Sequence, residues 1–225
     1  MNNEPKSLKG NIGIFAREGL PFIVITGVLF LIAIGYHLPL WVKLLVGLPF
    51  LFSLQFFRNP ERVPPDEPLA VISPADGKVC QQAYVEDSPL GGPAKKISVF
   101  MNVFNVHVNR SPYDGVVETI QYTPGRFLVA ERDEASEENE RNLVVIRTPE
   151  GCRVAWVQVA GFVARRVVCY LHEGDRTHTG RRMGLIRFGS RLDVFLPPES
   201  EVNVQVGQKV KAGITVLGRL KCPEE

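Results

Sequence analysis

Glu173-Gly174-Asp175-Arg176-Thr177-His178-Thr179-Gly180 is one of two similar stretches in this sequence, and Val206-Gly207-Gln208-Lys209-Val210-Lys211-Ala212-Gly213 is the other. Both contain two glycines six positions apart, and a further glycine, Gly184 or Gly218, follows each stretch. Glycine adopts the backbone dihedrals of tight turns without a steric penalty. The repeated spacing therefore predicts two equivalent hairpin corners.

Short runs rich in Val and Ile surround these two stretches, and Gly and Pro turns separate them. This spacing is typical of strands, so we expect a mainly β body that begins near residue 65. The predicted strands are Ala70–Ile72, Lys96–Met101, Gly115–Tyr122, Leu143–Thr148, Arg153–Val159, Val167–Tyr170, Gly184–Phe188, Leu192–Leu196 and Ile214–Leu217.

The expected body resembles the barrel-sandwich of biotinyl and lipoyl carrier domains. The segment Ser73-Pro74-Ala75-Asp76-Gly77-Lys78-Val79 is similar to their opening strand. A carrier domain needs a modifiable lysine in a tight turn between methionine-like residues, and this sequence has none. A membrane-tethered, non-catalytic lipoyl-like adaptor or binding module is nevertheless one of the two functions that the sequence leaves open.

Apolar residues are concentrated before residue 58. Leu20–Tyr36 contains no charge, and Leu38–Phe57 is interrupted only by Lys43, Ser53 and Gln55. A spanning helix needs about 20 mostly apolar residues, with a lower limit near 17. The sequence thus predicts a helical hairpin in the membrane, followed by a Pro-rich linker that ends at residue 64.

Two observations bear on how this anchor lies in the bilayer. Lys6, Lys9 and Arg17 precede the two apolar runs, and Arg58 and Arg62 follow them. The positive-inside rule then places both ends, and the β body, on the cytoplasmic side of the cell (inner) membrane. A hairpin that dips into the bilayer without crossing it is the alternative, because prolines weaken both helices.

The net charge and the spacing of the cysteines indicate which partners and metal sites to expect. The net charge is only +2, which does not indicate a nucleic-acid partner. The four cysteines, Cys80, Cys152, Cys169 and Cys222, form no CxxC pair and have no metal-ligand spacing with the four histidines. We expect a reduced, cytosol-facing body without a metal site.

A Gly-Ser bond in Arg187-Phe188-Gly189-Ser190-Arg191 is a candidate for self-cleavage. Gly189 has no Cβ to shield its carbonyl, and the hydroxyl of Ser190 is the neighbouring nucleophile. An N-to-O acyl shift and elimination across Cα–Cβ of Ser190 would leave dehydroalanine, which hydrolyses to a pyruvoyl group. Gly-Ser is also a common turn dipeptide, so the prediction depends on the residues that accompany it.

His107 is the candidate base for this reaction. It lies between two valines on an expected strand, where alternation places Asn105, His107 and Asn109 on one polar face. Histidine accepts a proton near neutral pH, and a carboxylate such as Asp76 could fix its tautomer. A structural histidine is the alternative. The other histidines, His37, His172 and His178, belong to the membrane turn or flank a hairpin corner.

Four motifs in this order are together similar to the short form of phosphatidylserine decarboxylase, a self-processing, pyruvoyl-dependent family. The acidic stretch that contains the third motif would by itself predict only a solvated loop or a short helix. The motifs are Ser73-Pro74-Ala75-Asp76-Gly77, Phe104-Asn105-Val106-His107-Val108-Asn109-Arg110, Glu138-Asn139-Glu140-Arg141-Asn142 and Phe188-Gly189-Ser190-Arg191. The resemblance covers essentially the whole chain, including the anchor.

The resemblance implies a triad of Asp76, His107 and Ser190, with cleavage between Gly189 and Ser190 and conversion of Ser190 into the pyruvoyl cofactor. Large and small chains, 1–189 and 190–225, would stay together, and residues 65–225 would form the decarboxylase domain. Phosphatidylserine in the membrane would then be converted to phosphatidylethanolamine through a Schiff base with the pyruvoyl ketone. The oligomeric state is left open, a homo-oligomer included.

Arginines are the natural ligands for the phosphate of this substrate. The candidates in the sequence are Arg110, Arg165 and Arg166.

Overall fold

The computed structural model describes residues 13–125, 139–161, 166–187 and 190–222. The chain divides into two compact units between Glu61 and Arg62. The predicted Arg165 and Gly189, and Phe188 beside it, lie outside the described residues.

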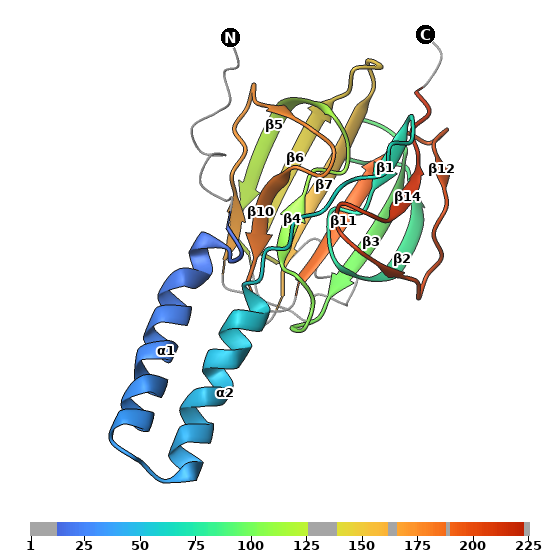
Figure 1. Ribbon diagram of the computed structural model, residues 1–225. Helices are drawn as coiled ribbons and strands as arrows, with labels where there is room; N and C mark the ends of the chain where they lie inside the picture. The colour runs from blue at the N-terminus through green and yellow to red at the C-terminus, as the bar shows by residue number, and fades with distance from the viewer. Residues whose placement is uncertain (1–12, 126–138, 162–165, 188–189, 223–225) are drawn as a thin grey trace. The chain divides into compact units, whose positions relative to one another are not determined.

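The first unit is a hairpin of two apolar helices, α1 (Leu20–Gly35) and α2 (Leu40–Phe56), after a 3-10 turn at Arg17–Gly19 (Figure 1). Two glycines allow the helices to approach each other. A Cβ on Gly27 would lie 3.0 Å from the ring of Phe50, and one on Gly47 would lie 2.9 Å from the ring of Phe30. These two rings stack on each other with their centroids 5.9 Å apart.

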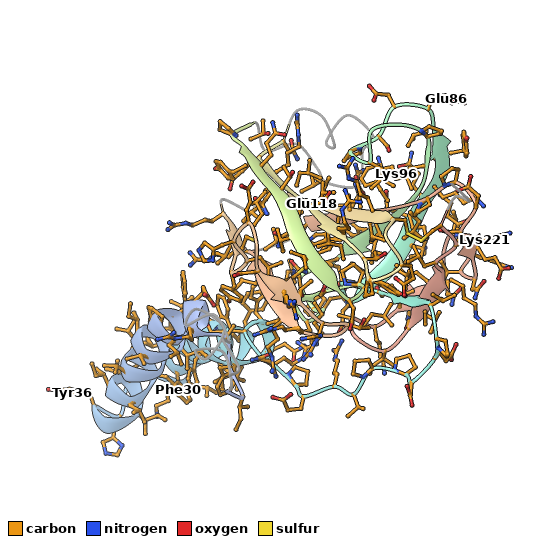
Figure 2. All side chains as sticks on the ribbon, turned by 90° about the horizontal axis from the view of Figure 1, so that it is seen from above. Phe30, Tyr36, Glu86, Lys96, Glu118 and Lys221 are labelled. Carbon is orange, nitrogen blue, oxygen red and sulfur yellow. A yellow bond between two sulfur atoms is a disulfide. The ribbon has the colours of Figure 1, made fainter. Side chains whose placement is uncertain are left out.

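The positions of its prolines and its exposed apolar side chains distinguish this hairpin from helices that pack inside a protein core. Pro21 lies in the first turn of α1, where a missing N–H costs nothing, whereas Pro49 lies inside α2. Apolar side chains remain exposed along both helices, among them Leu31 at 67% and Leu45 at 64%. The segment Arg17–Gly35 is long and apolar enough to cross a bilayer, whereas α2 is shorter. This N-terminal apolar helix indicates membrane association. Figure 2 shows the side chains of the hairpin, with Phe30 and Tyr36 labelled.

The second unit consists of antiparallel strands in three sheets. An eight-stranded sheet has the order β13-β2-β3-β11-β7-β6-β5-β9, and two three-stranded sheets have the orders β1-β14-β12 and β4-β10-β8. The strands are β1 (Ala70–Ile72), β2 (Gly77–Val85), β3 (Ala94–Met101), β4 (Val108–Arg110), β5 (Gly115–Thr123), β6 (Arg141–Arg147), β7 (Arg153–Ala160), β8 (Val167–Cys169), β9 (Arg176–Thr177), β10 (Arg182–Ile186), β11 (Ser190–Leu196), β12 (Glu201–Val202), β13 (Lys209–Val210) and β14 (Val216–Arg219).

These sheets repeat one arrangement twice. From one edge of the large sheet to its centre the strands are β13-β2-β3-β11, and from the other edge to the centre they are β9-β5-β6-β7. Each strand of the first half is therefore equivalent to the strand at the same position in the second half. The small sheets correspond in the same way, because β1-β14-β12 matches β4-β10-β8. The second unit therefore has internal pseudo-two-fold symmetry, with β11 and β7 as the central pair (Figure 1).

The repeated glycine stretches are the corners of this symmetric arrangement. Each has a turn, a two-residue strand and a second turn, and the two strands, β9 and β13, are the opposite edges of the large sheet. The glycines Gly174, Gly180, Gly207 and Gly213 have φ angles of 83°, 79°, 94° and 74°. The sequence prediction of equivalent corners is confirmed, since these left-handed conformations suit glycine.

A second repeated motif pairs with these corners. Ser73-Pro74-Ala75-Asp76-Gly77 leads into β2, and Ser111-Pro112-Tyr113-Asp114-Gly115 leads into the equivalent β5. Gly213 N–H donates to the carbonyl of Ser73 at 2.8 Å, and Gly180 N–H donates to that of Ser111 at 2.9 Å. The two turns are thus bound to the two corners by the same backbone contact.

One copy is inserted into the other along the chain. In one copy β6 and β7 are joined by a short turn, and Arg147 pairs with Arg153. In the other copy β3 ends at Met101 and its partner β11 begins at Ser190, with all of β4 to β10 between them in sequence. Ser190 is therefore the point where the chain returns from the inserted copy to the first one.

The core is shared by all three sheets. Apolar side chains of the large sheet, such as Val99 and Trp156, pack with Val71 of β1 and Ile186 of β10, and all four are fully buried. The predicted mainly β, barrel-sandwich-like body with an N-terminal helical hairpin is confirmed. The strands absent from the prediction are the short β9, β12 and β13, together with most of β2, whereas β4 overlaps the strand expected around His107 but begins only at Val108.

The expectation of fully reduced cysteines is wrong. The Sγ atoms of Cys152 and Cys222 are 2.16 Å apart and form a disulfide. Their Cα atoms are 5.5 Å apart, within the normal range for a disulfide. Spacing along the chain could not reveal this pair, because 70 positions separate the two cysteines.

Candidate active site

Ser190 occupies a fully buried position at the start of β11. Its neighbours across the sheet are Met101 on β3 and Ala160 on β7. Its Oγ is buried and has no hydrogen-bond partner among the described residues. Buried hydroxyls normally find a partner, so the Oγ of Ser190 is a polar group that the fold leaves available for another purpose.

His107 is also buried, with 1% of its surface exposed. It lies just before β4 instead of on a strand, because the chain between Met101 and Val108 turns at residues 103–105. Its Nδ1 is 3.0 Å from the carbonyl oxygen of Asn105. A carbonyl can only accept, so this contact places the proton of a neutral ring on Nδ1 and leaves Nε2 as the basic nitrogen.

Asp76 lies in the first of the two Ser-Pro-x-Asp-Gly turns. Its Oδ1 accepts the N–H of Ala212 at 2.8 Å, and its Oδ2 accepts an N–H of the Arg62 guanidinium, also at 2.8 Å. The hydrogen bonds of this carboxylate therefore go to Arg62 and Ala212, and the Nδ1 of His107 has the Asn105 carbonyl as its contact. The turn itself lies against β4, because the N–H of Arg110 donates to the carbonyl of Pro74 at 2.9 Å.

The acidic motif that precedes β6 meets the neighbours of Ser190. Asn139 Nδ2 donates to the carbonyl of Ala160 at 2.7 Å, and the N–H of Ala160 donates to the carbonyl of Glu140 at 2.9 Å. The carboxylate of Glu140 accepts the N–H of Val167 at 3.1 Å. The third and fourth motifs therefore meet at Ala160, although about 50 positions separate them in the sequence.

A chain of buried amides, which sequence reasoning missed, also reaches this region. Asn142 Nδ2 donates to Gln158 Oε1 at 3.2 Å, and Gln158 Nε2 donates to Asn109 Oδ1 at 2.9 Å. The Nδ2 of Asn109 then lies 3.7 Å from the sulfur of Met101, which is the cross-strand neighbour of Ser190. Asn109 lay on the predicted polar face, but Gln158 carried no signal in its apolar strand.

The opposite face of β11 holds a buried ionic cluster. Arg191 is fully buried, and its Nε is 2.9 Å from Oδ1 of Asp193. Lys96, labelled in Figure 2, lies 3.3 Å from Oδ2 of the same carboxylate. Two charges in alternation on one strand were the available signal for this cluster. It fixes the residue that follows Ser190.

The predicted substrate arginines differ in their surroundings. Arg110 is buried, and one of its guanidinium N–H groups donates to the carbonyl of Gly180 at 2.7 Å. Arg166 is exposed, and its carbonyl accepts the N–H of Arg187 at 3.4 Å. Arg166 is thus held beside the segment that leads to Ser190.

A cavity of about 690 Å³ lies away from this site. Its lining includes Arg153, at the start of β7, and both disulfide cysteines, whereas Ala160 at the other end of β7 is the neighbour of Ser190. Seven strand steps of about 3.3 Å separate these ends by roughly 23 Å. The cavity therefore does not belong to the Ser190 region. Among the described residues no cluster of three or more His, Cys, Asp or Glu side chains could hold a metal.

Comparison with known proteins gives one consistent result. The phosphatidylserine decarboxylase family model matches residues 50–218. The chain belongs to the phosphatidylserine decarboxylase family. A phosphatidylserine decarboxylase proenzyme of Syntrophus aciditrophicus is 50% identical over 204 residues, which cover 90% of this chain and 96% of the relative. The proenzyme of Desulfotalea psychrophila is 47% identical, with 91% and 96% covered.

A third relative agrees with these two. The phosphatidylserine decarboxylase proenzyme of Cupriavidus metallidurans is 50% identical over 213 residues, which cover 92% of this chain and 95% of the relative. Family membership favours the decarboxylase over the non-catalytic adaptor that the carrier-domain resemblance left open.

Proposed function

We propose that this chain is a proenzyme that cuts itself between Gly189 and Ser190 and then decarboxylates phosphatidylserine to phosphatidylethanolamine. The observation that carries the proposal is the buried Oγ of Ser190 at the start of β11, which has no hydrogen-bond partner in the part of the chain that the structure describes, in a member of this family. A hydroxyl in this position is the nucleophile that the cleavage needs.

The cleavage balances without an external reagent other than water. Ser190 Oγ attacks the carbonyl carbon of Gly189, the C–N bond breaks, and an ester replaces the amide. Removal of the Cα proton of residue 190 then expels the Gly189 carboxylate and leaves a C=C bond between Cα and Cβ. Hydrolysis of the resulting dehydroalanine releases ammonia and leaves the pyruvoyl group on the chain 190–225.

His107 is the proposed base in this sequence. Its Nδ1–H is held by the Asn105 carbonyl, so Nε2 is the atom that takes the proton of Ser190 Oγ. It then gives this proton to the departing nitrogen of residue 190 as the C–N bond breaks, and in the next step it takes the proton from Cα. Asp76 is the proposed third member of the triad. Asp76 lies in the turn that β4 contacts, and its carboxylate accepts hydrogen bonds from Arg62 and Ala212.

A pyruvoyl group at residue 190 would take the buried position that Ser190 holds at the start of β11. The group supplies a ketone that condenses with a primary amine and draws electrons from the bond to the departing carboxylate. The buried position of residue 190 would exclude water from the substrate carboxylate, which favours its loss. Of the two proposed phosphate ligands that the structure describes, Arg166 is exposed and is the nearer in sequence to Ser190. Arg110 is the buried candidate.

The anchor gives this enzyme its access to a lipid substrate. We propose that residues 1–64 hold the protein in the cell (inner) membrane and that the decarboxylase domain, residues 65–225, faces the cytoplasm. Arg17 before α1 and Arg58 after α2 support this orientation through the positive-inside rule.

Two measurements test the proposal. His107→Ala should accumulate the uncut precursor, and His178→Ala, at an exposed corner, is the matched control that should be cut normally. Phenylhydrazine, which captures ketones, should label the small chain and block lipid decarboxylation by the processed enzyme. Normal cleavage of His107→Ala would show that His107 is not the base. Full activity in the presence of phenylhydrazine would show that the reaction does not depend on a ketone.

A further inference from the structure

The two Ser-Pro-x-Asp-Gly turns are equivalent in backbone but differ in how their carboxylates are held. Oδ1 of Asp114 accepts both the N–H and the hydroxyl of Thr179, each at 2.6 Å. Oδ1 of Asp76 accepts the N–H of Ala212 at 2.8 Å. Ala212 stands at the position of Thr179 in the other copy, directly before the corner glycine, and has no hydroxyl.

Arg62 takes the place of this missing hydroxyl from outside the repeat. Its guanidinium binds both carboxylate oxygens of Asp76, one of them at 2.8 Å, and donates to the carbonyl of Ala212 at 2.7 Å. The side chains of Arg62 and Asp76 are only 9% and 11% exposed. A Cβ on Gly213 would lie 2.8 Å from Cδ of Arg110, so glycine leaves room for the arginines that gather here.

A buried ion pair holds a turn only at a large cost in desolvation free energy. Desolvation of the two charges offsets much of their attraction, and a pair of this kind is weak evidence for stability alone. The Asp114 copy holds the same turn with a hydroxyl and a carboxylate that is 46% exposed. The Arg62 pair therefore does more than the turn requires.

We propose that Arg62 is a positioning residue for self-processing, acting through Asp76. This inference rests on the proposed function, in which Asp76 takes part in the cleavage. The two parallel N–H···O contacts of an arginine fix the plane of a carboxylate, which a single hydroxyl or ammonium does not do. Arg62 thereby fixes Asp76 and its turn, and the Pro74–Arg110 contact passes that position to the strand that follows His107.

The test measures how fast newly made full-length chain is cut, with thermal unfolding followed in parallel. Arg62→Lys keeps the charge and loses the planar fork. It should fold and be cut on the order of a hundredfold more slowly, the loss expected when a reacting group moves by about 1 Å. Arg219→Lys, which changes an exposed arginine paired with Glu67, is the matched control and should be cut at the normal rate.

A second variant separates positioning from support of the turn. Arg62→Ala combined with Ala212→Thr gives the Asp76 turn the hydroxyl that Thr179 gives to the Asp114 turn. We expect this double variant to regain the thermal stability that Arg62→Ala loses, and to stay slow in cleavage until methylguanidinium is added. Cleavage at the normal rate without methylguanidinium would show that Arg62 only supports the turn, and would overturn the inference.

Coupling to Asp76 is tested with Asp76→Asn. If Arg62 acts through Asp76, adding Arg62→Lys to Asp76→Asn should slow cleavage no further. Independent, additive slowing would overturn the inference. Wild-type chain that is never cut would overturn the proposed function and the inference with it, whereas normal cutting of Arg62→Lys beside a slowed Asp76→Asn would overturn the inference alone.

Discussion

Ser190, the first residue of β11, pairs across the large sheet with Met101, the last residue of β3. In the equivalent pair of strands, β6 and β7, the facing ends are joined by a short turn. Between Met101 and Ser190 the whole inserted copy intervenes. A cut just before Ser190 would therefore release one end of the insertion and leave β11 between β3 and β7, so the sheet does not depend on the bond that is cut.

Because of the disulfide, we expect the two chains of the processed protein to separate only after reduction. Cleavage before Ser190 would place Cys152 in the large chain and Cys222 in the small one. Processed protein, with thiols blocked at lysis, should run as one band on a denaturing gel without reductant and as two bands with dithiothreitol. Cys222→Ser should give two bands under both conditions. Two bands from the unreduced wild type would contradict the link.

Removal of residues 1–57 should leave a folded body that no longer binds membranes. Both apolar helices lie before residue 58, and the second unit has its own core. The measurement is co-sedimentation with phospholipid vesicles, with circular dichroism as the control for folding. A truncated body that sediments as well as the full chain would place the membrane-binding surface in the strands.

Gln158→Leu should destabilise the second unit. Gln158 connects Asn142 to Asn109, and its loss leaves two buried amides each short of one partner, at a cost of about 1–3 kcal/mol for each. The matched control is Gln121→Leu, at an exposed position of β5. Chemical denaturation of both variants measures the difference. Equal stabilities would show that the buried amides are not coupled through Gln158.

Asp114 should make the stability of the second unit depend on pH. Burial raises the pKa of its carboxyl, but hydrogen bonds from Thr179 and the contact with His178 outweigh burial and hold that pKa below its usual value. The resulting stabilisation is present above the unfolded pKa of about 3.9 and is lost as the pH falls through the folded pKa. Asp114→Asn should thus be less stable than wild type at neutral pH, with the difference shrinking in acid.

Denaturation at a series of pH values, from neutral to below about pH 3, measures this difference. A gap between Asp114→Asn and wild type that stays constant across the series would contradict the account. It would show that the Thr179 contacts serve the neutral carboxyl as well as the ionised one.

The sequence predicted those parts of the fold that depend on local chemistry. The corners at Gly180 and Gly213 could be predicted because a left-handed backbone favours glycine, and the anchor could be predicted because membrane helices need long apolar runs. Partners distant in sequence gave no such signal. The insertion of one copy into the other, and the pairing of Cys152 with Cys222, follow from strand order, which no local pattern encodes.

The site shows the same limit. The sequence singled out Asp76, His107 and Ser190 by motif and residue type, and the roles of these three residues stay predictions. The Arg62 contact with Asp76 could not be foreseen, because Arg62 lies in the Pro-rich linker, where no sequence pattern indicates a partner in the β body. Gln158 was hidden for a related reason, since one polar residue in an apolar strand is compatible with a surface position as well as with a buried amide chain.

Intact mass after full reduction tests the central claim most directly. Purified wild-type chain should give two masses, one for residues 1–189 with a free Gly189 carboxylate and one for residues 190–225 with a pyruvoyl group in place of the N-terminal serine. Ser190→Ala should give the single mass of the uncut chain. A wild-type protein that decarboxylates phosphatidylserine while keeping one uncut mass would contradict the account.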